Sequence, residues 1–294
     1  MNKAIASLVV TALLSALCVT AAAQEERVVI LTPRELPADV TPQVSLGQCG
    51  IWTGHYGPID YRSAAQVTRK RVETHHFDGY LPQFYTWLPG QQFSHYIAAN
   101  FSYTLRAFPN HPVTLMLMEQ IGRRLKTEAI PGSYYPLECW YLRGMQAVPD
   151  DPMVRAQYGI YLANRGRTKE ALYNLDIGEK GLCRSPVMQH YIGLAYLAAG
   201  VARKAQINAM RSEQLGFPGT ALRRQLEAAG KWDQALESSP ALTADVCSEA
   251  ATVDAPEAAS AAQSPASAPG APSVVSPEAS PAKPSLDIPA AAGR

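Results

Sequence analysis

The chain contains two stretches in which small residues return at the same positions. Residues 156–171 read AQYGIYLANRGRTKEA, and residues 190–205 read HYIGLAYLAAGVARKA. Three pairs of small residues coincide when the stretches are aligned: Gly159 with Gly193, Gly166 with Gly200, and Ala171 with Ala205. We call the distance along the chain from residue 156 to residue 190 the repeat interval. A period between about 20 and 50 residues is typical of solenoid folds, in which each unit packs only against its neighbours.

The places of these small residues indicate two antiparallel helices in each unit. Two helices can cross closely only where their side chains are small. Gly159 and Ala171 occupy such places, and Gly178 and Ser212 form a further pair at the same interval. Gly166 lies between the predicted helices, where glycine readily adopts the left-handed conformation that ends a helix. The sequence therefore predicts a series of helical hairpins.

This pattern resembles the tetratricopeptide repeat (TPR). The stretch VPDDP (residues 148–152) resembles the boundary between two such repeats, and FPNHP (residues 108–112) looks like an earlier one. Pro109 and Pro149 are separated by more than the repeat interval, so we expect the extra residues in the helix–helix turn at 126–135. The boundary proline is replaced by Cys183 in one unit and by Phe217-Pro218 in the next.

The resemblance covers about residues 101–232 and implies an all-α fold, namely a short TPR-like helical-repeat solenoid. Residues 220–232, TALRRQLEAAGKW, are expected to form a capping helix with a polar outer face. Residues 24–100 are rich in glycine, proline and aromatic side chains, and we expect an irregular region packed on the repeats. Within it, VVILTP (residues 28–33) predicts a short strand or extended segment.

Both ends of the chain look separate from this fold. Residues 1–23 combine Lys3, an apolar run and an Ala-Ala-Ala cleavage site before polar residues, which predicts a secretory signal peptide. An uncleaved anchor is the alternative, whereas Leu17 before Cys18 argues against lipid attachment. We therefore expect an exported bacterial protein, periplasmic or secreted, without a membrane span after cleavage.

The C-terminal residues 248–294 consist mostly of Ala, Pro and Ser with few large apolar side chains. Such a segment cannot bury enough surface to offset the entropy lost on ordering it, so we predict a disordered tail. Residues 233–247 form a short extension between the repeats and this tail.

Signal cleavage would leave four cysteines, and an even number in an exported chain favours disulfides. Three pairings are possible, and we favour Cys49–Cys139 with Cys183–Cys247 because each would tie a peripheral segment to the repeats. There is no Cys-x-x-Cys pair to suggest thioredoxin-like chemistry or a zinc ribbon.

In the resemblance, the first helix of each unit forms the inner face of the superhelix and would bind a partner. That face lacks the Lys, Arg and Asn cluster with which some family members hold a terminal carboxylate, and it is apolar. The repeat register places these residues on it: Met153, Ala156, Ile160, Ala163, Asn164, Val187, His190, Leu194, Leu197 and Ala198.

An exposed apolar face of this size needs a cover, either a partner's amphipathic segment or the chain's own N-terminal region. The sequence leaves both open. Leu194→Glu should abolish partner capture while leaving thermal unfolding nearly unchanged. We therefore predict a protein-binding scaffold of the cell envelope, without a cofactor and with an unknown oligomeric state.

Other functions have weaker support. The net charge of +1 argues against binding nucleic acid through its phosphates. An alternative is a glycan or small-ligand binding module that uses the aromatic side chains of Trp52, Tyr56, Tyr85 and Trp87. A metal-dependent hydrolase is less favoured, because no metal-binding spacing joins the candidate residues and no nucleophile motif occurs, so we expect no enzyme. Those candidates are His55, Asp60, Glu73, His75 and His76.

Overall fold

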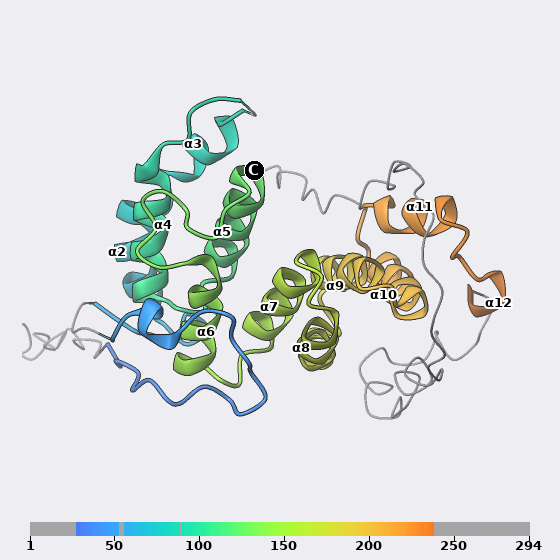
Figure 1. Cartoon of the computed structure of the whole chain (residues 1–294), viewed down its shortest axis with the longest axis horizontal. Helices are drawn as coiled ribbons and strands as arrows, with labels where there is room; N and C mark the ends of the chain where they lie inside the picture. The colour runs from blue at the N-terminus through green and yellow to red at the C-terminus, as the bar shows by residue number, and fades with distance from the viewer. Residues whose placement is uncertain (1–27, 53–55, 89, 238–294) are drawn as a thin grey trace, which may run out of the picture.

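The structure is a computed structural model that describes residues 28–52, 56–88 and 90–237. Within these residues it is helical and contains no strand, so the all-α prediction is confirmed there, while VVILTP forms no strand. Figure 1 shows the helices following one another from α2 to α12. Their bounds are η1 (Leu46–Cys49), α2 (Gln66–His76), α3 (Leu81–Thr86), α4 (His95–Ala107), α5 (Pro112–Leu125), α6 (Leu137–Ala147), α7 (Pro152–Asn164), α8 (Thr168–Gly181), α9 (Pro186–Ala198), α10 (Ala202–Gln214), α11 (Ala221–Ala228) and α12 (Gln234–Glu237).

Three helices, α5, α7 and α9, each begin with proline as the first helical residue: Pro112, Pro152 and Pro186. Proline suits this position because it has no N–H to leave unpaired and its φ is already helical. The preceding side chain of His111, Asp151 or Ser185 accepts a backbone N–H of the first turn. The sequence thus marks three equivalent helix starts by a cap followed by proline.

The predicted close crossings are present in the α7–α8 and α9–α10 hairpins. A β-carbon added to Gly159 of α7 would lie 2.7 Å from Cγ of Leu175 on α8. One added to Gly193 of α9 would lie 2.9 Å from Cβ of Asn208 on α10. Ala171 is fully buried. Small residues are therefore required at these places because the helices touch there.

The turns between paired helices also follow the prediction. Gly166 and Gly200 have φ values of +72° and +85°, in the left-handed region where glycine has no steric penalty. Each lies in a short connection, 165–167 or 199–201. Between α5 and α6 the connection is longer and occupies residues 126–136, where the extra residues of this unit were expected.

The predicted irregular region, residues 24–100, contains more helix than expected. Helices α2 and α3 lie within it, and α4 begins there. Helix α2 (QVTRKRVETHH) buries only Thr68 and Val72, so its sequence carries little apolar periodicity. The helix packs against α4, and this tertiary contact stabilises it although its own sequence pattern does not predict a helix.

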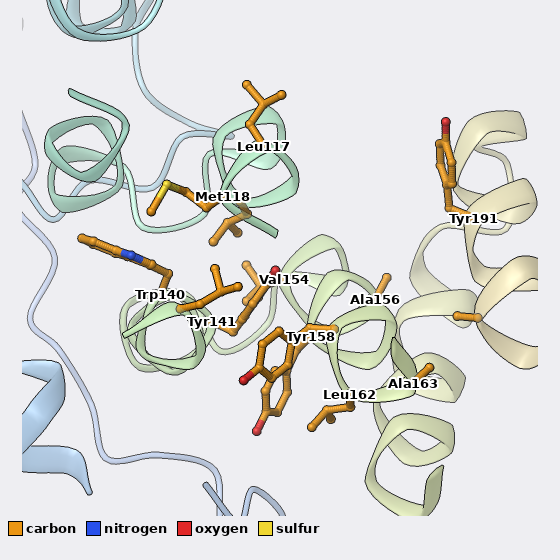
Figure 2. Packing of buried hydrophobic residues seen from close by; sticks show 14 of the residues in the cluster. Leu117, Met118, Trp140, Tyr141, Val154, Ala156, Tyr158, Leu162, Ala163 and Tyr191 are labelled. Carbon is orange, nitrogen blue, oxygen red and sulfur yellow. The ribbon is translucent and has the colours of Figure 1, made fainter. Parts of the chain in front are cut away.

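A continuous core joins α3 to α11, and a second, smaller buried cluster contains Val72 of α2 with Ala107 and Phe108. Figure 2 shows buried side chains filling the spaces between neighbouring helices, with Met118 and Trp140 on facing helices and Tyr158 beneath them. Trp140 and Tyr141 of α6 are each only 1% exposed. The core extends through α9 to Leu222 and Leu226 of α11, where the predicted capping helix is found.

The N-terminal residues 28–52 run along α6 (Figure 1), to which a disulfide attaches them. Cys49 and Cys139 are bonded, as predicted for this pair. The second predicted pair, Cys183–Cys247, involves Cys247, which lies outside the described residues, as do the predicted signal peptide and most of the C-terminal extension and tail. No helix of the described residues is long and apolar enough to span a membrane.

Candidate partner-binding face

A hollow of about 490 Å³ lies where the C-terminal ends of α5, α7 and α9 meet. The connection after α5 closes one side of it. The hollow is mainly polar where α5 ends and apolar where α9 ends. Its lining residues are Gly122, Arg123, Lys126, Thr127, Glu128, Ala163, Asn164, Arg165, Leu197 and Ala198.

A second hollow, about 50 Å³, lies next to the first, since Arg123 and Asn164 line both. It is mostly apolar and is formed by α5, α6, α7 and α9. We call the surface that lines the two hollows the α5–α7–α9 face. The residues of the small hollow are Met116, Glu119, Gln120, Arg123, Tyr141, Gln157, Ile160, Asn164, Met188 and Tyr191.

A hydrogen-bonded network fixes the polar wall between the hollows. Glu119, only 7% exposed, accepts bonds from Asn164 Nδ2 at 3.1 Å and from the Arg165 guanidinium at 3.0 Å. The same guanidinium bonds Glu128 at 2.6 Å and lies 3.6 Å from the Tyr161 ring centroid. The buried Glu119 and the mostly buried Arg165 thus hold each other in place by a charge-assisted hydrogen bond.

The protonation states of the wall follow from burial. Burial raises the pKa of Glu119, although the charge of Arg165 opposes this effect. Burial also raises the pKa of Tyr141, so its phenol stays protonated and neutral at ordinary pH. The face presents the Asn164 amide, cations, the Glu128 carboxylate bonded by Arg165, and apolar side chains. This combination suits recognition of a polar peptide or anion.

Only part of the predicted groove reaches the hollows. Ile160, Asn164 and Leu197 line them, as do the flanking Ala163 and Ala198. The predicted Met153, Val187, Ala156, His190 and Leu194 line neither hollow. Met153 is half-buried and Val187 is 47% exposed elsewhere on the surface.

Three predicted groove residues belong to the interior instead. Ala156 is fully buried against Gly178 of α8. His190 and Leu194 are each 4% exposed, and the His190 ring stacks on Phe217 at 4.3 Å. The expectation that Leu194 could be changed without loss of stability is therefore wrong. The repeat register identified the helices that form the face. It predicted that these three side chains lie on the surface of those helices, whereas they point into the core.

The expected absence of a Lys, Arg and Asn cluster is also corrected. Arg123, Lys126, Asn164 and Arg165 all line the large hollow. They come from the ends of α5 and α7 and from the long connection, which the repeat register did not include. Shifting Ile160 back by the distance from Pro152 to Pro112 gives Gln120, which lines the small hollow, so the register locates part of the α5 wall but not the cationic residues.

The described residues of the N-terminal region do not line the two hollows of this face. No residue from 28–52, 56–88 or 90–107 lines either hollow. The N-terminal segment is instead held on another side, where Arg155 pairs with Asp39 at 2.8 Å and Arg167 donates to the Thr41 carbonyl at 2.9 Å. The sequence left two possible covers for the face, a segment of a partner and the chain's own N-terminal region. The described N-terminal residues do not provide this cover.

The aromatic candidates for glycan binding are not gathered at one site. Trp52 lies 3.8 Å from the Arg143 guanidinium of α6, whereas Trp87 is contacted by Arg124 of α5. The Tyr56 hydroxyl is buried without a hydrogen-bond partner, and Tyr85 is 42% exposed on α3.

The metal and acid–base candidates are also separated. Asp60 is bonded by Arg62 and Asn110, Glu73 by Tyr61 and His111. His76 bonds Asn100, His75 lies beside it on α2 without joining these carboxylates, and His55 is outside the described residues. No group of three or more His, Cys, Asp or Glu side chains in the described residues is placed to hold a metal ion.

Comparison with known proteins adds nothing to this geometry, since no family model, no curated protein and no solved structure matches the chain.

Proposed function

We propose that this chain is an exported protein-binding scaffold built from TPR-like helical hairpins, and that its α5–α7–α9 face binds a segment of another cell-envelope protein. The observation that carries the proposal is the hollow of about 490 Å³, lined by the ends of three successive first helices. A hollow of this size suits a few side chains of a bound segment.

Three features support the repeat interpretation. The first helices of the three hairpins start alike, at Pro112, Pro152 and Pro186. The hairpins cross at small residues such as Gly159 and Gly193. The lining residues follow the repeat interval, since Gln157 and its equivalent one unit later, Tyr191, both line the small hollow. Successive first helices thus form one surface, as expected for a solenoid.

A partner suits the face better than a reaction does. Its side chains are cations, amides and apolar groups with two carboxylates, Glu119 and Glu128, and both carboxylates are bonded by Arg165. Export is supported by the Cys49–Cys139 disulfide, because such bonds persist in oxidising compartments. The alternative of glycan binding has less support, because the four candidate aromatic side chains do not form one surface.

Site-specific crosslinking tests this function. A photo-crosslinking amino acid placed at Ala198, which is exposed and lines the large hollow, should join the chain to an envelope protein in cells. The same group at Val67, 55% exposed on α2, is the matched control. Equal products from both positions, or none from either, would contradict a specific partner on this face.

A further inference from the structure

One end of the molecule is formed by a long uncharged segment. Residues 79–105 contain no Asp, Glu, Lys or Arg, although 17% of the whole chain is charged. They include α3, its connection to α4, and most of α4. Figure 1 shows α3 and this connection at the top of the view, beyond the ends of α4 and α5. We call residues 81–88 and 90–96 the aromatic tip. Charged side chains normally dominate such protruding surface, so their absence here points to a surface that meets something other than water.

Aromatic and apolar side chains take the place of charges on the aromatic tip. Tyr85 is 42% exposed and Leu88 is 58% exposed. Trp87 and Phe93 are half-buried and support each other, with ring centroids 4.8 Å apart. Tyr96, in the first turn of α4, is 62% exposed. Tyrosine and tryptophan are favoured where an apolar phase meets water, because each has an apolar body and one polar atom. The tip therefore has the composition of an interfacial segment.

Several polar groups of the aromatic tip already have partners within it. Trp87 Nε1 donates to the Gln91 carbonyl at 3.1 Å, and the Leu88 N–H donates to Gln91 Oε1 at 3.0 Å. Thr86 Oγ1 donates to the Pro82 carbonyl at 3.0 Å. A polar group that leaves water without a partner costs about 2–7 kcal/mol. These local bonds therefore lower the cost of moving the tip into an apolar medium.

Positive charge lies beside the aromatic tip. The Arg124 guanidinium of α5 lies 4.9 Å from the centroid of the Phe84 ring and 5.4 Å from that of the Trp87 ring. Its hydrogen bond goes to the Trp87 carbonyl, so these contacts leave its charge uncompensated. Lys126 is exposed just after the end of α5. A cation near an anionic membrane surface contributes about 1 kcal/mol to binding. The tip thus combines an apolar surface with a positive border.

We propose that the aromatic tip docks on the surface of a bilayer that contains anionic phospholipid, with Tyr85 and Leu88 entering the interface. Arg124 and Lys126 then contact the lipid phosphates. The tip protrudes and none of its residues lines either hollow, so it suits a flat lipid surface better than a glycan, which needs a concave site. Shallow insertion of this kind requires no membrane-spanning helix. The inference concerns a different surface from the α5–α7–α9 face and goes beyond the proposed function.

Vesicle binding by the full chain tests the inference. The protein is mixed with vesicles of phosphatidylglycerol and phosphatidylethanolamine in equal parts, and bound protein is separated by flotation. Leu88→Glu should bind at least about tenfold more weakly, because a charge replaces an inserted apolar group. Val67→Glu, at a position 55% exposed on α2, is the matched control and should bind like the wild type. All variants carry the same chain ends, so any contribution of the ends is constant. Thermal melting verifies that both variants fold.

Two further measurements test the charge and the inserted side chains separately. Lys126→Gln should weaken binding to the anionic vesicles about fivefold and leave binding to neutral phosphatidylcholine vesicles unchanged. Vesicles with brominated acyl chains quench the fluorescence of tryptophans that reach the bilayer. Trp87→Phe should remove most of this quenching. Trp52→Phe is the matched control and should retain it, because Trp52 is also half-buried against an arginine, Arg143, but lies outside the tip.

Each outcome either supports or overturns the inference. Equal binding by Leu88→Glu and Val67→Glu, no binding by the wild type, or quenching that persists in Trp87→Phe would overturn it. A Trp87 response to soluble cell-wall glycan fragments, with none to vesicles, would also overturn it and make the tip a glycan-binding surface. If Leu88→Glu does not fold, the Lys126→Gln and Trp87→Phe measurements decide. Crosslinking at Ala198 tests the proposed function independently, because no residue of the tip lines either hollow.

Discussion

Ala156 of α7 and Gly178 of α8 are in direct contact, since a β-carbon added to Gly178 would lie 2.6 Å from the Ala156 Cβ. The same added atom would lie 2.7 Å from the Ala156 Cα, so neither helix could yield by a side-chain rotation alone. The close crossing of α7 and α8 therefore depends on both residues being small. The repeat comparison predicted this for Gly178, whereas it placed Ala156 on the groove face.

Gly178→Ala should lower the free energy of unfolding by about 2 kcal/mol, because the added methyl group forces two backbones apart. Chemical denaturation followed by circular dichroism measures this change. Gly79→Ala is the matched control, since no atom lies within 4 Å of its added β-carbon. Equal denaturation midpoints for the two variants would mean that the crossing is looser than described.

Much of this hairpin arrangement was predictable because its determinants are local. Glycine at a left-handed turn, as at Gly166, and proline after a capping residue, as at Pro152, depend only on nearby backbone geometry. The side chains that form the face were less predictable. Leu194 and His190 follow the repeat register but are buried, His190 against Phe217 of the connection to α11. The pattern of residues within one helix does not reveal that a residue from another segment, such as Phe217, covers a side chain.

The cationic residues were missed for a related reason. Lys126 lies in the connection that interrupts the repeat interval, so no alignment of units places it beside Asn164. Helix α2 was missed because its residues carry almost no apolar periodicity, and its stability comes from packing on α4. Both depend on contacts between distant segments, which a repeat comparison does not contain.

Leu194→Glu should destabilise the protein by about 4 kcal/mol, because it places a charge where the leucine is only 4% exposed. Ala198→Glu, on the same helix but exposed, should change stability by less than about 0.5 kcal/mol. Thermal melting of the two variants measures this contrast. A Leu194→Glu protein as stable as the wild type would show that this side chain faces outward after all.

Reduction of Cys49–Cys139 should lower stability by about 4 kcal/mol, because the bond closes a loop of 90 residues in the unfolded chain. Urea denaturation with and without reductant measures the effect. The Cys49→Ser variant separates it from reduction of any other disulfide: it should have the lower stability already, and reductant should add little. An unchanged midpoint in Cys49→Ser would show that α6 holds the N-terminal segment without this bond.

His190 should make the protein less stable in mild acid. Burial lowers its pKa from 6.5 to about 4, so the folded state keeps the ring neutral while the unfolded chain protonates. Its contribution is complete above pH 6.5 and is lost as the pH falls toward 4. At pH 5 this loss amounts to about 2 kcal/mol relative to pH 7.5.

His190→Leu isolates this effect from that of the carboxylates, whose lowered pKa values act mostly below pH 4, as for Glu73 and Asp60. Urea midpoints measured between pH 7.5 and 4.5 should fall more steeply for the wild type than for His190→Leu. The difference between the two curves should grow through pH 6 and level off near pH 4. Parallel curves would place the His190 ring in contact with water, and its stacking on Phe217 would then have to open in solution.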